Sequence, residues 1–406
     1  MSSLESLPLL VALVGIAVIL AILLKASLQK IGIPALIGYL GLGLMLGLAD
    51  ERWDILGLMG RDVFAFLADL GLICLLFRVG IESKLSKLMA QLKRASLIWF
   101  GNVVMSGASG FLVAYYGLRL ALVPSLFVAI ALTATSIGVA VTVWQEKNAL
   151  DSPNGQLLLD VAEMDDISAV VLMALLFTLV PALQEGEGLP PSGQIGSILL
   201  SFTVKAIVFG GFCYGFSIWI EPHVTRFFRR LEPQPDFTLS VLGIGFVIAA
   251  LAGLLGFSEA IGAFFAGLVF SRDPIAVKIL ASFDTIYDLF VPFFFIGISL
   301  KLDFSYLGSG LQLGWMLLIT ATLGKIIGAG IPAWLMSNKT SAALLSISLV
   351  PRAEISMVVM QHGFDMGADV VPAAVFSGMI VVTAVTSFGI PLLLRPLLQK
   401  WPQASH

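Results

Sequence analysis

The stretch LDVAEMDDISAVVLMALLFTLV, residues 159–180, decides the fold class of this chain. It is long and apolar enough to cross a bilayer as a helix, yet it carries two adjacent acids, Asp165 and Asp166. Counted from the polar start of the run near Gln156, the pair lies about 15 Å along a helix, close to the middle of a ~30 Å hydrocarbon core. A carboxylate at that depth costs about 2.5–3.5 kcal/mol, so it indicates an ion or proton site.

The composition around this stretch is that of a polytopic membrane protein. Of the 406 residues, 58% are hydrophobic and 12% are charged, and the mean hydropathy is +0.99. A soluble domain carries about 25% charged residues, so a large globular enzyme is excluded. Cys74 and Cys213 both lie in apolar runs, which argues against a disulfide framework or a zinc site. We expect neither a cofactor nor a nucleic-acid partner.

Hydropathy and turn residues predict an all-α membrane protein of about thirteen transmembrane helices. The ninth and tenth spans are short or interrupted by proline, so this count holds to within about one. The expected spans are 7–25, 33–49, 63–81, 96–117, 123–144, 156–180, 194–220, 238–255, 257–271, 287–300, 313–335, 341–362 and 371–395.

The basic residues give the orientation. With the N-terminus outside, fifteen of the 23 Lys and Arg residues fall in inner loops and four in outer loops. By the positive-inside rule the C-terminus is then cytoplasmic. The remaining four lie inside spans: Arg78, Lys205, Lys325 and Arg352. A local ion pair with Glu82, one turn on, accounts for Arg78, whereas Lys325 and Arg352 fall near span centres and need partners there.

The two halves of the chain resemble each other. VGIESKL at 79–85 matches IGISLKL at 296–302, an offset of 217, and at the same offset 131–145 falls on 348–362. Three glycines recur at a slightly larger offset of 224: Gly32, Gly38 and Gly43 correspond to Gly256, Gly262 and Gly267. These matches, together and in order, predict an internal repeat of six spans.

The repeat divides the chain into three parts. Residues 1–180 form the first repeat, 181–237 a linking span and cytoplasmic loop, and 238–406 the second repeat, with no soluble regulatory domain expected. An odd number of spans separates equivalent helices, so the two repeats are inverted in the membrane. Inverted repeats are typical of transporters whose site lies at the bilayer midplane.

The fifth and twelfth spans both carry polar interruptions at their centres, TATS at 133–136 and PRAE at 351–354. Pro351 disfavours helix at the residue before it, so we expect discontinuous helices with exposed half-helix ends. Our hypothesis is that Arg352 faces carbonyl ends and Glu354 faces amide ends, whereas hydroxyl oxygens line the ion path. These hydroxyls belong to Thr133, Thr135 and Ser136. The alternatives are a plain proline kink and hydrogen bonding between helices.

Lys325 needs an acid, and Asp165 or Asp166 at the same depth is the natural partner. Two adjacent carboxylates in a low dielectric cannot both ionise freely, so the pair can take up and release protons. A hard cation such as Na⁺ prefers carboxylate and hydroxyl oxygens, which makes Asp166, Asp165 and Thr135 its expected ligands. Competition between cation and proton for these oxygens couples two opposing fluxes. The alternative is a purely structural ion-pair cluster.

These residues carry a family resemblance. Six segments distributed along the whole chain carry it, in their order and spacing: GFSEAIGAFFAGLVFSRDP at 256–274, LLFRVGIES at 75–83, the TATS run, the Asp pair, Gly324-Lys325 and the PRAE run. The chain resembles the monovalent cation–proton antiporter superfamily, on the branch that holds Kef-type potassium systems and bacterial Na⁺/H⁺ exchangers.

The resemblance implies a Na⁺/H⁺ antiporter-like fold in a bacterial inner (plasma) membrane. Its fifth and twelfth helices would be broken and crossed in a mobile core domain. This core would move like an elevator against a dimerisation domain within a homodimer. The resemblance also implies that Asp166 binds the ion and that Asp165 pairs with Lys325. Glu163 and Glu259 are expected on an access route, or as solvated helix ends.

We therefore expect a secondary active antiporter, not an enzyme, which exchanges a monovalent cation for protons. Na⁺ is favoured over K⁺ and Li⁺, and the Asp-Asp pair with Lys resembles the electrogenic exchangers. A K⁺/H⁺ antiporter or Kef-like K⁺ efflux transporter is the alternative, although such relatives usually carry Gln before the Asp and a nucleotide-binding domain. A sodium-coupled symporter of an organic anion is disfavoured, because an anion site would hold fewer acids.

Overall fold

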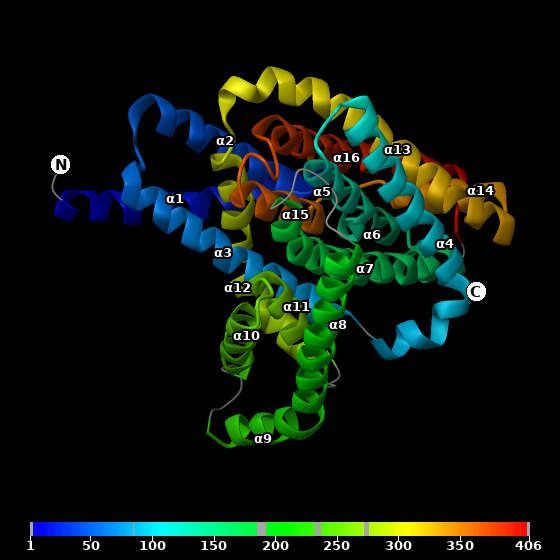
Figure 1. The fold of residues 1–406 in the computed structure, drawn as a ribbon, viewed down its shortest axis with the longest axis horizontal. Coiled ribbons are helices and arrows are strands. Elements are labelled where there is room, and N and C mark those ends of the chain that lie inside the picture. The colour runs from blue at the N-terminus through cyan, green and yellow to red at the C-terminus, as the bar shows by residue number, and fades with distance from the viewer. Residues whose placement is uncertain (1–2, 84, 185–191, 232–236, 272–275, 404–406) are drawn as a thin grey trace. The chain divides into compact units, whose positions relative to one another are not determined.

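A computed structural model describes residues 3–83, 85–184, 192–231, 237–271 and 276–403, and the regular elements in these ranges are helices (Figure 1). Within them, nine helices are long and apolar enough to cross a membrane. Two shorter apolar helices, Thr238–Leu254 and Glu259–Phe270, accompany them. The all-α membrane fold is confirmed.

All thirteen expected spans lie on helices, and the fifth and twelfth are each split into two short helices. The α-helices are α1 (Ser3–Lys30), α2 (Ala35–Trp53), α3 (Gly57–Glu82), α4 (Leu85–Leu112), α5 (Leu122–Thr133), α6 (Ile137–Glu146), α7 (Pro153–Gln184), α8 (Ser192–Gly215), α9 (Glu221–Leu231), α10 (Phe237–Leu254), α11 (Glu259–Phe270), α12 (Ala276–Leu300), α13 (Leu307–Met336), α14 (Lys339–Ser348), α15 (Glu354–Asp365) and α16 (Ala373–Lys400). Short π-helical turns follow α4 and α8 (Val113–Gly117 and Phe216–Ile220), and a 3₁₀ turn, Phe304–Tyr306, precedes α13.

The chain divides into two compact units, and each takes helices from both halves of the sequence. The first unit comprises Met1–Ile22, Leu42–Leu85 and Phe177–Leu300. The second comprises Leu23–Gly41, Ser86–Leu176 and Lys301–His406. Because this division follows packing, it does not test the repeat boundaries at 180 and 238, which stay a prediction.

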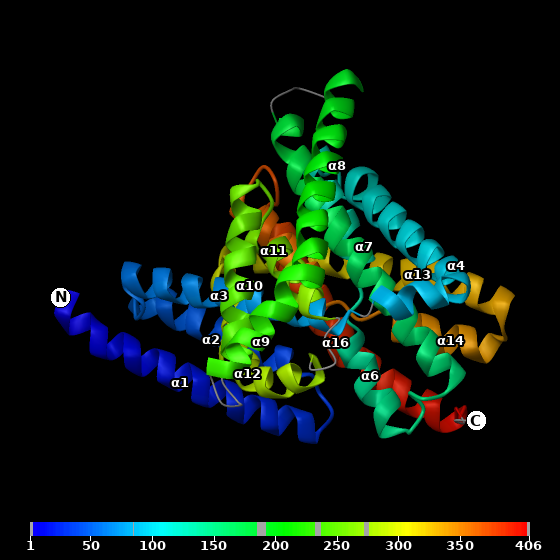
Figure 2. The same ribbon diagram turned by 90° about the horizontal axis from the view of Figure 1, so that it is seen from below.

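In the first unit, α3 packs against α11 and α12, and α10 lies beside α11 (Figures 1 and 2). The predicted ion pair of Arg78 with Glu82 is confirmed, with Arg78 Nε 2.8 Å from Glu82 Oε1. Arg78 also pairs with Asp284 at 3.0 Å and lies over the ring of Tyr287. The guanidinium thus joins α3 to α12.

In the second unit, α13 runs alongside α16 and contacts α14 (Figure 2). A core cluster of buried apolar residues from α4, α6, α7, α13, α14 and α16 surrounds the fully buried ring of Trp144. The indole Nε1 of Trp144 donates a hydrogen bond to Ser348 Oγ at 2.9 Å, which links the two split spans. This unit holds both split spans and the acid pair.

The geometry supports the internal repeat. Helix α14 begins 217 residues after α5 (339 against 122), and α15 begins 217 residues after α6 (354 against 137). Gly32 and Gly256, 224 residues apart, both adopt a positive φ, +71° and +85°, just before α2 and α11. Glycine has little penalty in this left-handed conformation, so the same turn is built in both halves.

One expected loop is partly helical. The basic segment 221–237 was expected as a cytoplasmic loop, but residues 221–231 form α9. The π-helical turn Phe216–Ile220 continues directly into α9, where the Glu221 N–H donates to Phe216 O, so the helical run extends past the expected end of the span at 220. Residues 232–236 of that segment, part of the linker 181–193 and the end of the run 256–274 lie outside the described residues.

Candidate functional site

The first break lies in the fifth expected span, where α5 ends at Thr133 and α6 begins at Ile137. Ala134 and Ser136 are extended, with ψ angles of 150° and 99°. Thr and Ser side chains compete for backbone hydrogen bonds and therefore favour helix ends. Thr133 Oγ1 donates to Ile130 O at 2.8 Å in this way, so its side chain is bound within its own helix.

The second break lies between Ser348, the end of α14, and Glu354, the start of α15. Pro351 at its centre has no N–H, but its carbonyl accepts a hydrogen bond from the Ser136 N–H at 2.9 Å. Ser356 Oγ, on α15, donates to Ala131 O on α5 at 2.7 Å. The two breaks therefore meet, as the prediction of crossed discontinuous helices requires.

Arg352 closes the end of α14 from within its own break. Its Nη1 donates to the carbonyl oxygens of residues 349, 350 and 351, at 3.2, 3.1 and 3.4 Å. The side chain is 0% exposed. Its backbone is held by α16, because its N–H donates to Thr386 Oγ1 and its carbonyl accepts from Ser387 Oγ, each at 3.1 Å. The prediction that Arg352 faces carbonyl ends is confirmed for Leu349 O, the cap of α14, whereas the other two carbonyls belong to the break.

Glu354 lies in the first turn of α15, where a carboxylate complements the amide ends of a helix. Its Oε2 accepts a hydrogen bond from Ser136 Oγ at 2.9 Å. Ser136 is thus tied to the second break by both its backbone N–H and its hydroxyl. Of the three hydroxyls, those of Ser136 and Thr135 bond between helices, which was the alternative to lining a path.

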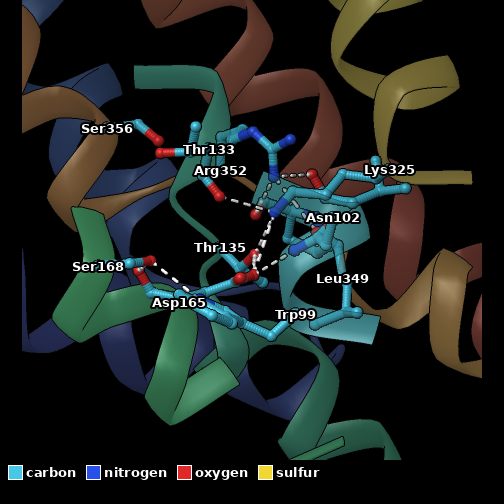
Figure 3. Close-up of polar contacts among 12 residues, drawn as sticks. Trp99, Asn102, Thr133, Thr135, Asp165, Ser168, Lys325, Leu349, Arg352 and Ser356 are labelled. Carbon is cyan, nitrogen blue, oxygen red and sulfur yellow. Dashed lines mark hydrogen bonds and ion pairs between the residues drawn. The ribbon is translucent and has the colours of Figure 1, made fainter. Parts of the chain in front are cut away.

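Lys325 pairs with Asp165, as predicted (Figure 3). The ammonium Nζ of Lys325 lies 3.1 Å from Asp165 Oδ2, and both side chains are 0% exposed. Nζ also donates to Thr133 O and to Thr135 Oγ1, both at 2.7 Å. All three N–H groups of the ammonium are therefore used, and Lys325 from α13 closes the end of α5.

Three donors converge on a single carboxylate oxygen, Asp165 Oδ2 (Figure 3). Besides Lys325, Thr135 Oγ1 donates to it at 2.6 Å and Asn102 Nδ2 at 2.5 Å. Four elements meet here: α4, the first break, α7 and α13. Thr135 Oγ1 accepts from the ammonium and donates to the carboxylate, so it links the two charges.

The other predicted acids are more accessible. Asp166 is partly exposed, unlike its neighbour Asp165. Glu163 is also partly exposed and lies three residues earlier, on the same side of α7. Glu259 is exposed in the first turn of α11, in the other compact unit. The structure thus brings Asp165, Lys325 and Thr135 together and leaves Asp166 beside them partly exposed.

Comparison with known proteins identifies the family. The family model described as "Sodium/hydrogen exchanger, transmembrane" matches residues 15–400. The chain belongs to this family. It is a multi-pass membrane cation/proton antiporter and not an enzyme.

Relatives of this exchanger cover most of its length. A Na⁺/H⁺ antiporter of Enterococcus hirae is 25% identical over 92% of this chain and 94% of its own. The high-affinity Na⁺/H⁺ antiporter NhaS3 of a Synechocystis strain is 28% identical over 83% of this chain and 72% of its own. The solved structure of the sodium proton antiporter MjNhaP1 from Methanocaldococcus jannaschii has the same fold, with a TM-score of 0.69, 15% identity, and 98% and 97% of the two chains covered.

Several residues of this exchanger's site were missed by sequence reasoning. Asn102, on α4, donates to the central carboxylate, and Thr386 and Ser387, on α16, hold the backbone of Arg352. Asn102 could have been found as an amide within the apolar run WFGNVVMSG. The two α16 hydroxyls are ordinary residues of membrane helices, so the sequence offered no signal for them.

Proposed function

We propose that this chain exchanges Na⁺ for protons, electrogenically, by elevator-type alternating access. Asp166 would bind the cation, with Asp165 and Thr135 as further ligands and Lys325 as the group that the cation displaces. Thr133, Ser136, Arg352 and Glu354 would hold the broken helices in place. Cation and proton would occupy the same oxygens in turn, which couples their fluxes.

One observation carries this proposal: the ammonium of Lys325 and the carboxylate of Asp165 are both fully buried, whereas Asp166 next to them is partly exposed. A buried ion pair is weak evidence for stability, because the cost of desolvation offsets the attraction. Beside a partly exposed acid, however, a cation that binds there can change the charge interaction between Lys325 and Asp165. Paired acids within a membrane protein mark ion and proton pathways.

The proposal also covers the domain roles, the oligomeric state and the membrane orientation of the chain. The two compact units would be a mobile core and a dimerisation domain of a homodimer in a bacterial inner membrane. The N-terminus would lie outside and the C-terminus in the cytoplasm. Glu163 and Glu259 would lie on access routes. K⁺ or Li⁺ in place of Na⁺, or an organic anion carried with Na⁺, are the other outcomes that the experiment separates.

The experiment is dissipation of a pH gradient in proteoliposomes, with Na⁺, K⁺ or Li⁺ added in turn across the neutral pH range. We expect Na⁺ to release the gradient most strongly and Asp166→Asn to abolish the flux. Asp151→Asn, the same change at an exposed position just before α7, is the matched control and keeps the flux. Wild-type exchange in the Asp166→Asn protein would remove that residue from its proposed role. An imposed membrane potential that leaves the wild-type rate unchanged would contradict electrogenic exchange.

A further inference from the structure

Asn102 is placed beside the ion pair by a close contact between two helices. A side chain on Gly101 would collide with Gly328 O, 2.5 Å away, and a side chain on Gly328 with Gly101 O, 2.6 Å away. Small residues let helix backbones approach in this way. Asn102 on α4 and Lys325 on α13 thereby reach the same carboxylate from neighbouring helices. Asn102 is 0% exposed.

A second contact fixes α4 against α7. Trp99 Nε1 donates to Ser168 Oγ at 3.1 Å, and Ser168 Oγ donates to Asp165 O at 2.9 Å. Trp99 lies three residues before Asn102 and therefore on the same side of α4. The position of the Asn102 amide relative to Asp165 is thus set by the helices and not by a flexible loop.

The two carboxylate oxygens of Asp165 differ in the number of hydrogen bonds that they accept. Oδ2 accepts from Asn102, Thr135 and Lys325. Oδ1 is buried and accepts no hydrogen bond within the described part of the chain. Each carboxylate oxygen has about two lone pairs, so Oδ2 is fully used and Oδ1 keeps both of its own. A buried oxygen left this way is costly unless something else binds it.

We infer that Asn102 is a positioning residue that reserves Asp165 Oδ1 for the transported cation. By donating to Oδ2 from a fixed direction, it stops the carboxylate from rotating and sharing its donors between both oxygens. Because the amide is neutral, it holds the carboxylate without adding a positive charge that would repel the cation. This inference rests on the proposed function, in which Asp165 shares the cation with Asp166.

The test separates cation affinity from turnover. Asn102→Leu keeps a branched side chain with the same number of heavy atoms and removes the donor, and Asn102→Ala removes it without any risk of a clash. At one fixed pH we expect both to raise the KM for Na⁺ about tenfold, the loss typical of a hydrogen bond to a charged group, while the maximal rate falls less than about threefold. Asn102→Gln, which keeps the amide, should recover part of the affinity. Should K⁺ or Li⁺ drive the larger flux, the KM is measured for that ion.

Two control variants lie on the same helix. Ser106→Ala is one turn further along the same face, buried, and removes a hydroxyl without a hydrogen-bond partner in the described residues, so KM and rate should stay at wild-type values. Trp99→Phe removes the other α4–α7 hydrogen bond, so it should lower thermal stability and raise the KM less than the Asn102 variants do, because the close contact of Gly101 with Gly328 still positions Asn102.

The outcomes are distinguishable. If both Asn102 variants lose maximal rate with an unchanged KM, Asn102 serves only the fold and the inference is wrong. The proposed function then still stands, provided that wild-type exchange is present and Asp166→Asn is inactive. A wild-type protein without cation-dependent proton flux would overturn both.

Discussion

The two breaks occupy matching places in the repeat but close their helix ends differently. At the first break, the carbonyl end of α5 accepts from Lys325, which comes from another helix and also holds Asp165. At the second, Arg352 belongs to the break itself and donates to the cap carbonyl of α14, Leu349 O, and to two carbonyls of the break. At the offset of 217, Arg352 corresponds to Thr135.

The difference separates a fixed charge from an exchangeable one. A guanidinium stays protonated, so it suits a permanent closure of the break. In Arg352 the Nη1 group alone serves the three carbonyls, whereas Nε and Nη2 are buried without a partner in the described part of the chain. An ammonium is a compact charge on a flexible stem, and a buried lysine changes its protonation readily. The second break is therefore built to stay closed, whereas the first is coupled to the acid pair. Four substitutions test this comparison.

The largest loss of stability should follow Arg352→Met, which keeps an unbranched apolar side chain and removes the guanidinium. Three buried carbonyls would lose the guanidinium, and only Pro351 O would keep another donor, the Ser136 N–H, so the cost is about 3 kcal/mol or more. We expect the apparent melting temperature in detergent to fall well below that of the wild type, and exchange to fall with it. A stable, active Arg352→Met protein would show that the second break does not need its own cation.

The same substitution at the first break, Lys325→Met, should act more on transport than on stability. Asp165 would keep Asn102 and Thr135 as neutral donors, so the protein should melt closer to the wild type than Arg352→Met does. Exchange should persist at about a tenth of the wild-type rate, with a weaker response to an imposed membrane potential. Lys205→Met, at an exposed lysine on α8, is the control. If the exchange rate of Lys325→Met responded to an imposed membrane potential as strongly as that of the wild type, Lys325 would not contribute to the electrogenicity.

A smaller effect is expected for Thr135→Val, which has nearly the same shape but no hydroxyl. It removes the link between the ammonium and the carboxylate, and leaves their direct contact at 3.1 Å. Stability should fall by about 1–2 kcal/mol and exchange several-fold. Thr135→Ser restores the hydroxyl and should recover most of the rate; a rate equal to that of Thr135→Val would indicate a packing role for the methyl group.

The smallest effect is expected for Ser136→Ala. Glu354 loses one hydrogen bond from a partly buried hydroxyl, worth about 1 kcal/mol or less. The bond from the Ser136 N–H to Pro351 O remains, because it belongs to the backbone. Exchange should stay within about twofold of the wild type in the same proteoliposome assay. A loss as large as that of Lys325→Met would mean that the Ser136 hydroxyl contributes to the ion site itself.

The sequence predicted the helices, both breaks and the central ion pair, because each has a strong local signal. Charges and proline are rare in membrane spans, so Asp165, Lys325 and Pro351 stand out from their surroundings. The partners of Lys325 could be limited to two acids by depth alone. Choosing Asp165 over Asp166 required the family resemblance, since adjacent residues on a helix lie at nearly the same depth.

What the sequence could not predict depends on helix packing. Asn102 reaches Asp165 only because α4 and α13 approach closely, and that approach is a property of two surfaces, not of either segment. The hydroxyl of Thr133 was expected on the ion path, yet it bonds to its own helix and only its carbonyl reaches Lys325. The role of a polar side chain in such a site thus depends on which neighbouring group it contacts once the helices are packed.

The contacts between the two breaks have a consequence for any motion of the exchanger. The Ser136 N–H is bonded to Pro351 O, and Ser356 Oγ to Ala131 O, so each broken span is fastened to the backbone of the other. Neither half-helix can slide alone without breaking a hydrogen bond of a buried amide or carbonyl group. Spectroscopic labels on α6 and α15 should therefore keep a constant separation through the whole cycle, and serve as an internal ruler against which the displacement of other helices is measured.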